Sequence, residues 1–107
     1  MIPSHRTATH PGEILQEEYL SPLEVTQSAF AKHLGVPFQR INELINGKRG
    51  ITPETALMLA GALNTSPQYW MNLQAAFDLT STRLERVVKP LFAREVAPRK
   101  KLRRTTA

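Results

Sequence analysis

The sequence predicts an all-α domain built from five helices. Two observations carry this prediction: apolar residues recur at helical spacing, and strand patterns are essentially missing. The clearest stretch is 27–46, where two short helical patterns flank Gly35. The first pattern holds Phe30, Ala31 and Leu34, and the second holds Ile41, Leu44 and Ile45. Because Gly35 can adopt a positive φ just past the first pattern, we predict a helix, a sharp turn and a second helix.

This stretch has the pattern of a helix-turn-helix unit. Ala31 is the smallest apolar side chain at the point where two steeply crossing helices must approach closely. Ile41 and Leu44 then close the underside of the second helix, which in such units enters the major groove of DNA. An ordinary hairpin of two helices gives a similar short pattern, and the motif alone leaves that alternative open.

Capping residues place the starts of the other helices. His10 precedes Pro11, and proline is tolerated at the first helical position because its missing N–H would be unpaired there. Thr26 is a good N-cap for the helix that follows it. The remaining start signals are Thr52-Pro53 and Ser66-Pro67.

Helix ends are predicted from proline and from residues that accept a positive φ. The first helix ends around Leu20-Ser21-Pro22-Leu23, since the residue before a proline disfavours the helical region. Asn64 can stop the fourth helix in the left-handed conformation. After residue 79 the apolar period weakens. A short extra C-terminal helix is predicted there from Leu84, Val87 and Val88, ending before Pro90.

The chain divides into three parts by composition and charge. Residues 1–9 are predicted to be a flexible N-terminal segment, residues 10–93 the helical domain, and residues 94–107 a flexible, disordered basic tail. The net charge is +5, but residues 83–107 hold nine Lys and Arg against two Glu, a balance of +7, which leaves −2 for residues 1–82. The tail can add non-specific phosphate contacts or fold against an acidic partner; its charge does not by itself make the body a nucleic-acid binder.

Several kinds of chemistry find no support in the sequence. Without cysteine there is no disulfide, thiolate metal site or thiol nucleophile. The three histidines lack metal-ligand spacing, and neither a Ser-His-Asp set nor a glycine-rich phosphate loop can be assembled. No apolar run reaches the roughly 18 residues of a membrane span, and no signal-peptide core is present. We therefore expect no enzyme activity, metal, cofactor or membrane partner, and a cytoplasmic location.

Six groups of residues form a recognisable set. They are His10-Pro11-Gly12-Glu13, Gly35-Val36, Gln39-Arg40-Ile41-Asn42-Glu43, Asn46-Gly47-Lys48-Arg49-Gly50-Ile51-Thr52, Thr55-Ala56-Leu57 and Trp70-Met71-Asn72-Leu73-Gln74. The stretch that they cover, from His10 to about Leu79, resembles the HigA/VapI-type antitoxins, whose DNA-binding domain belongs to the XRE (lambda-repressor-like) class. The chain departs from that family at Pro37 and Phe38, where a Ser or Thr cap followed by a polar residue is usual.

The resemblance implies a five-helix lambda-repressor-like fold and a DNA-binding antitoxin. Such a protein forms a homodimer, binds double-stranded DNA at a palindromic operator, represses its own operon and neutralises a HigB-like, mRNA-cleaving toxin. Two other functions stay open. One is a stand-alone XRE-family transcriptional regulator without a toxin partner, and the other is a helical module that binds only proteins.

The second helix of the motif supplies the candidate base contacts, which are Phe38, Gln39, Arg40, Asn42 and Glu43. Gln39 can pair with N6 and N7 of adenine, and Arg40 can reach guanine or a phosphate. Phe38 can pack on a thymine methyl, Glu43 can accept from cytosine N4, and Asn42 can serve a base or the DNA backbone. Without the resemblance, the same residues fit the solvated face of a short helix.

Phosphate contacts are expected from Gln27, Asn46, Lys48 and Arg49. Gln27 resembles the phosphate-contacting glutamine of the family, and the turn after the second helix places the other three beside the DNA backbone. Such contacts set register and affinity without reading the sequence.

The last strong apolar helix carries Tyr69, Trp70, Leu73 and Phe77. Such a stripe usually belongs to the core. In the resembling family, however, this helix forms part of the homodimer interface, and these four residues are our candidates for that interface.

Overall fold

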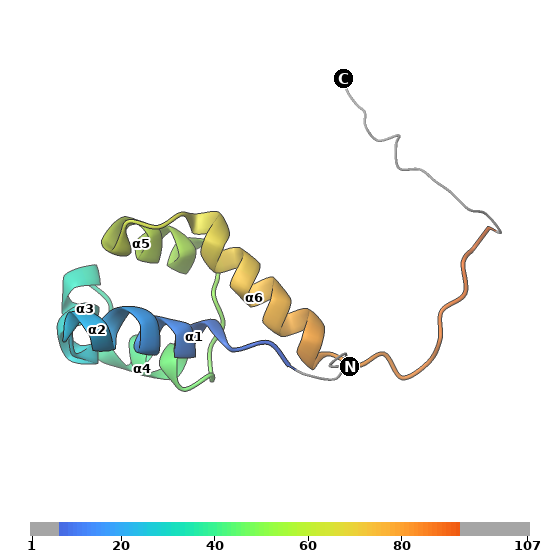
Figure 1. Cartoon of the computed structure of the whole chain (residues 1–107), viewed down its shortest axis with the longest axis horizontal. Coiled ribbons are helices and arrows are strands. Elements are labelled where there is room, and N and C mark those ends of the chain that lie inside the picture. Colours follow the sequence, from blue (N-terminus) through green and yellow to red (C-terminus); the bar gives the residue numbers. More distant parts are fainter. Residues whose placement is uncertain (1–6, 93–107) are drawn as a thin grey trace, which may run out of the picture.

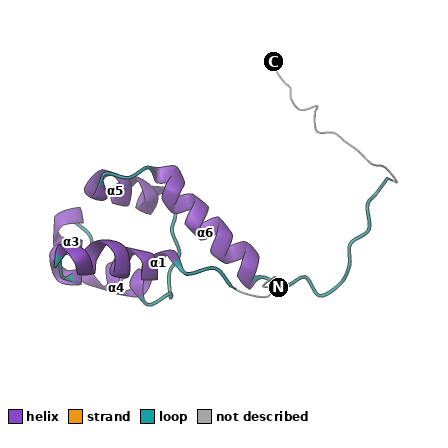
Figure 2. Cartoon of the chain, viewed as in Figure 1, coloured by secondary structure: helices purple, strands orange, loops and turns teal. Residues whose placement is uncertain are grey.

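The computed structural model describes residues 7–92, which form five helices and, within that range, no strand (Figures 1 and 2). The first is continuous and consists of α1 (Pro11–Ile14), the π-helical segment η2 (Leu15–Leu20) and α2 (Ser21–Leu23). The others are α3 (Gln27–Leu34), α4 (Phe38–Ile45), α5 (Pro53–Leu63) and α6 (Pro67–Ser81). The predicted all-α, five-helix class is confirmed.

The helix starts follow the capping residues in the sequence. Oγ1 of Thr26 accepts a hydrogen bond from the Ala29 N–H at 3.0 Å, which caps α3. Thr52 and Ser66 cap α5 and α6 in the same way, each followed by a proline. These three predicted helix starts are confirmed. At each one, a short side-chain acceptor satisfies a backbone N–H that the first turn leaves unpaired.

The ends of α2, α3 and α4 share one geometry. At the end of α3, Gly35 has φ +77° and its N–H donates to the Lys32 carbonyl, while the Val36 N–H donates to the Ala31 carbonyl. This pair of bonds is a Schellman motif, which satisfies carbonyls that the last turn leaves unpaired. Gly47 closes α4 and Glu24 closes α2 with the same pair of bonds. Asn64 ends α5 with φ 58°, as predicted.

The first helix ends at Leu23, inside the predicted stretch 20–23, but the predicted cause is wrong, because the residue before Pro22 stays helical. Ser21 keeps helical φ and ψ, and its N–H donates to the Gln16 carbonyl, five residues back. The backbone hydrogen bonds therefore depart from the ordinary α-helical pattern before the chain reaches Pro22. The helix continues to Leu23 and ends only at Glu24, which adopts a left-handed φ of 59°.

The core receives buried side chains from all five helices, including Phe30 and Ala31 from α3. Its largest fully buried side chain is Trp70, which packs with Leu15, Leu20, Leu44 and Leu59. The polar edge of the indole is also satisfied, since Nε1 donates to Oγ1 of Thr65 at 2.7 Å. The single tryptophan thus supplies the largest fully buried side chain of this small core.

Gly12 lets the first helix approach α4 more closely than any other residue would. A Cβ atom at Gly12 would overlap the carbonyl oxygen of Leu44 and lie 2.9 Å from Cα of Ile45. This backbone contact fixes α4 against α1, and it depends on a residue without a side chain.

The predicted short helix after residue 82 is wrong. Residues 82–92 carry no helix, and Leu84, Val87 and Val88 are all exposed. A helix this short is stable only when it buries an apolar face, and here nothing in the described chain covers one. The predicted tail over residues 94–107, and residues 1–6 of the predicted N-terminal segment, lie outside the described residues.

Candidate nucleic-acid interface

Helix α4 presents one polar row and is anchored by the opposite face. Ile41 and Leu44 are 2 % and 1 % exposed, so they hold the helix against the core. Gln39 and Asn46 point to the exposed side, and Asn42 and Glu43 lie partly exposed beside them. Phe38, at the first position of α4, is 49 % exposed, although it is a large apolar residue. The start of α4 therefore offers both hydrogen-bonding groups and an apolar contact.

Glu43 connects two of the predicted DNA-contacting residues. Its Oε2 accepts a hydrogen bond from Nε2 of Gln39 at 3.0 Å. Its Oε1 accepts from Nη2 and Nε of Arg49 at 3.0 and 3.3 Å. These hydrogen bonds, with that of Arg49 the stronger, hold the pKa of the Glu43 carboxyl below its ordinary value of 4.5. The structure thus brings Gln39, Glu43 and Arg49 together in one polar cluster.

Four side-chain amides connect the first helix to α4. Nδ2 of Asn42 donates to Oε1 of Gln27 at 2.9 Å, and Nε2 of Gln27 lies 3.5 Å from Oε1 of Gln16. At the other end Nδ2 of Asn46 donates to Oδ1 of Asn42 at 3.1 Å. The predicted residues Gln27, Asn42 and Asn46 therefore form one row with Gln16, which we call the amide row. Gln16 was not predicted, because its position in the helical pattern is that of any solvent-exposed residue.

Arg40 lies elsewhere. Its Nη2 donates to Oγ1 of the buried Thr55 at 3.0 Å and lies 3.4 Å from Oε1 of Glu54. The guanidinium is therefore directed toward the start of α5 and braces α4 against it. The side chain is thus engaged on the flank of the helix in this conformation, and the base contact of Arg40 stays a prediction.

The turn after α4 is held by a residue from α6. Oε1 of Gln74 accepts a hydrogen bond from the Ile51 N–H at 2.6 Å, and Nε2 of Gln74 donates to Oδ1 of Asp78 at 2.9 Å. Lys48 and Arg49 lie exposed in this turn, as predicted. The role of Gln74 was missed, although it belongs to one of the motifs above, because nothing in the spacing shows that α6 passes beside residue 51.

His10 is a third residue whose side-chain contacts the sequence did not show. Its Nδ1 accepts a hydrogen bond from the Gly12 N–H at 2.9 Å, which caps α1, and its ring meets that of Phe77 edge-on at 4.8 Å. Its Cδ2 also lies beside Gly47, at 3.9 Å from the position of a Cβ there. Burial lowers the pKa of His10 below 6.5, with the carboxylates of Asp78 and Glu13 partly opposing the shift.

Of the four candidate interface residues on α6, Trp70 is placed inside the protomer. It is fully buried within a single chain, so it has no surface to offer to a partner, and the prediction for Trp70 is corrected. Tyr69, Leu73 and Phe77 are partly exposed. Tyr69 also meets the Trp70 ring at 5.1 Å, and a hydrogen bond with Tyr19, together with burial, raises the pKa of Tyr69 to about 12.

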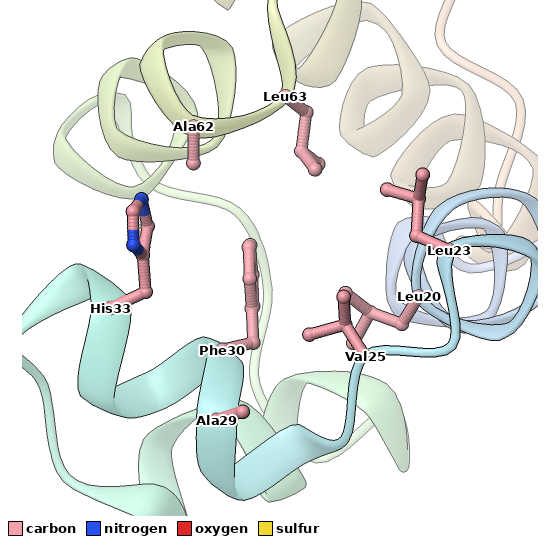
Figure 3. Close-up of a pocket in the computed structure, with 8 residues that line it drawn as sticks. All are labelled: Leu20, Leu23, Val25, Ala29, Phe30, His33, Ala62 and Leu63. Carbon is pink, nitrogen blue, oxygen red and sulfur yellow. The ribbon is translucent and has the colours of Figure 1, made fainter.

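A separate pocket of about 340 Å³ lies between α2, α3 and α5 (Figure 3). Its lining residues are Leu20, Leu23, Val25, Ala29, Phe30, His33, Ala62 and Leu63, which are all apolar except His33. Within residues 7–92, no group of three His, Cys, Asp or Glu side chains is placed to hold a metal ion. None of the described helices is long and apolar enough to cross a membrane.

A polar helix face, the short turn before it and a cationic turn after it define a helix-turn-helix domain. The helix-turn-helix family model HTH_3 matches residues 17–70. Virulence-associated protein I of Dichelobacter nodosus is 50% identical over 72 residues, which cover 67% of each chain. Antitoxin HigA-1 of Vibrio cholerae is 38% identical over 97 residues, which cover 86% of this chain and 91% of that protein.

A solved structure extends the comparison to three dimensions. The structure of the Pseudomonas aeruginosa antitoxin HigA with the higBA promoter matches 68% of this chain and 79% of its own, with a TM-score of 0.67 and 37% identity. The chain belongs to the helix-turn-helix family and, within its XRE class, to the HigA/VapI type.

Proposed function

We propose that this chain is the DNA-binding antitoxin of a HigB/HigA-type toxin–antitoxin module and represses its own operon as a homodimer. The observation that carries the proposal is the polar row of α4, anchored by Ile41 and Leu44 and followed by the cationic turn of Lys48 and Arg49. The relatives support it, since one is named an antitoxin and one solved antitoxin structure contains promoter DNA.

The DNA site is a palindrome whose half-sites lie about one helical turn, roughly 34 Å, apart, because two copies related by two-fold symmetry each insert one α4. Gln39, Asn42 and Glu43 read base edges, and Phe38 packs on a thymine methyl. Lys48, Arg49, Asn46 and Gln27 hold the phosphates and so set the register. Arg40 has a bracing role in this proposal, because its guanidinium lies against α5.

Dimerisation is assigned to α6. Tyr69, Leu73 and Phe77 are partly exposed apolar groups on this helix, and Leu79 near its end is 77% exposed. Tyr69, Leu73 and Phe77 recur every four residues, so they lie along one face of α6 that a second copy can cover. The corresponding measurement is the mass in solution, which we expect to be that of two chains.

The toxin binds a different surface of the helical domain from the one that binds DNA. Glu17 and Glu18 on η2 and Glu24 after α2 are exposed, and none of them takes part in the α4 cluster. A small basic ribonuclease suits this acidic group, since charge complementarity raises the rate of association and selects partners. The protein acts in the cytoplasm by binding, without catalysis, cofactor or metal.

Co-expression tests the proposal. The neighbouring toxin gene is expressed with the wild type, with Gln39→Ala, or with a Glu17/Glu18/Glu24→Lys triple variant, and growth is measured. We expect the wild type and Gln39→Ala to rescue growth, and the triple variant to bind the toxin more slowly while it still binds DNA. If no neighbour is toxic, or the wild type does not rescue growth, the antitoxin function is wrong and a stand-alone transcriptional regulator takes its place.

A further inference from the structure

The carboxylate of Glu43 is the unusual group on a surface proposed to meet DNA. DNA presents a dense row of phosphates, and an unpaired carboxylate placed beside them is unfavourable. In this chain the carboxylate is paired internally, since Gln39 donates to one oxygen and Arg49 to the other. Gln39, assigned to base readout, and Arg49, assigned to phosphate binding, are thus both hydrogen-bonded to the carboxylate of Glu43.

We propose that Glu43 is a specificity-determining residue that makes the phosphate contact of Arg49 depend on the base that Glu43 meets. The inference rests on the proposed function, because it concerns how the DNA-binding face selects its site. It adds a coupling between two contacts that were otherwise independent.

The coupling follows from competition for the same donors. Arg49 already uses Nη2 and Nε on Oε1 of Glu43, so a phosphate must compete with that carboxylate for the guanidinium. On a matching site, the N4 amino group of cytosine donates to Glu43 and releases Arg49 to the DNA backbone. On a non-matching site the amino group of that base pair lies on another base, away from Glu43, and Arg49 stays on Glu43.

Lys48 provides the contrast within the same turn. It is exposed, and the described residues include no carboxylate within ion-pair distance of it. Its phosphate contact is therefore available on every DNA sequence. The phosphate contact of Lys48 is thus independent of the DNA sequence, whereas that of Arg49 depends on the base that Glu43 meets.

The experiment measures binding of full-length Glu43→Gln to two DNA probes over a range of salt concentrations. One probe is an operator selected in vitro by the wild type from a random library, and the other is random-sequence DNA of equal length. Circular dichroism establishes that the variant is folded, and Glu43→Ala is the second variant should Glu43→Gln fail to fold.

We expect Glu43→Gln to bind random DNA about tenfold more tightly at low salt, with a salt slope steeper by about one, because Arg49 now contacts a phosphate on any sequence. The ratio of operator to random affinity should fall, and repeated selection should lose the preference for cytosine at one position. An unchanged ratio and an unchanged slope would overturn the proposal.

Two double variants show whether the effect passes through Arg49. In an Arg49→Gln background, adding Glu43→Gln should no longer change the salt slope on random DNA, whereas in a Lys48→Gln background it should change it as before. If the effect persists without Arg49, simple repulsion between the carboxylate and the phosphates explains it, and the coupling is wrong. If the wild type itself selects no DNA site, the proposed function fails, which is a separate outcome.

Discussion

Nδ2 of Asn42 donates a 2.9 Å hydrogen bond to Oε1 of Gln27, which joins the exposed face of α4 to the first residue of α3. The amide row extends this link to Gln16 on one side and to Asn46 on the other. A side chain held by its own protein loses less conformational freedom when it binds a partner. If Asn42 contacts DNA as proposed, the row holds its side chain in place before DNA binds.

Gln27→Ala should weaken operator binding by about tenfold, because it releases Asn42 and removes the proposed phosphate contact of Gln27. Helical content should stay unchanged. A double-mutant cycle with Asn42→Ala should give a coupling energy of about 0.5–3 kcal/mol, since the two side chains are in contact. Ser28→Ala, an exposed neighbour on α3, is the control. Strictly additive effects of the two substitutions would show that the amide bond does not prepare the surface.

Gly12→Ala should be severely destabilising, because its methyl group would overlap the backbone of Leu44 and separate α1 from α4. Overpacking of this kind costs about 1–3 kcal/mol where side chains can shift, and here the obstacle is backbone. Gly61→Ala is the matched control: Gly61 lies within α5 with open space around it, and alanine should stabilise the helix by up to about 1 kcal/mol. Thermal melts followed by circular dichroism should move in opposite directions for the two variants.

Acidification should destabilise the fold through His10. The folded state lowers the pKa of His10 and thus favours the neutral ring, whose Nδ1 caps α1. The contribution of His10 is therefore complete above its ordinary pKa of 6.5 and is lost as the pH falls below that value. His10→Asn keeps a side-chain acceptor without titrating in this range. Urea denaturation between pH 7.5 and 5 should show a smaller loss of stability for His10→Asn than for the wild type, and parallel curves would contradict this role.

Gln74→Ala should loosen the turn that carries Lys48 and Arg49. The variant leaves the Ile51 N–H without its acceptor, and an unsatisfied buried donor costs about 1–3 kcal/mol. Gln68 is a suitable control, because within the described residues the side chain of this glutamine on α6 bonds only to Asn72 of the same helix. We expect Gln68→Ala to change stability by less than about 0.5 kcal/mol. Equal melting temperatures for both variants would show that Gln74 does not hold the turn.

The local rules of helix capping account for most of what the sequence predicted correctly. Thr26, Gly35 and Asn64 act through bonds to residues within five positions, so their roles are visible in the sequence itself. The buried faces of α3 and α4 follow from helical spacing in the same way.

The placements and contacts that the sequence did not show arise where a distant element decides the outcome. Arg40 lies against α5 because Thr55 is buried within reach, and Trp70 is covered by residues from the first helix and α5. Gln74 and Gln16 act across gaps of 23 and 11 residues, which no local pattern shows. The helix through Pro22 depends on a widened turn that has no composition signal. The predicted helix after residue 82 is not formed, because its apolar residues are exposed and pack against nothing in the described chain.

The central claim is that α4 reads bases while the turn after it holds phosphates. The most direct measurement compares Gln39→Ala and Lys48→Ala on the selected operator and on random DNA over a range of salt concentrations. Gln39→Ala should cost about 1–3 kcal/mol on the operator only and relax the preference at one base pair, whereas Lys48→Ala should weaken both probes alike and reduce the salt slope by about one. If Gln39→Ala weakens binding to operator and random DNA equally, α4 does not read the sequence, and this account of the surface is wrong.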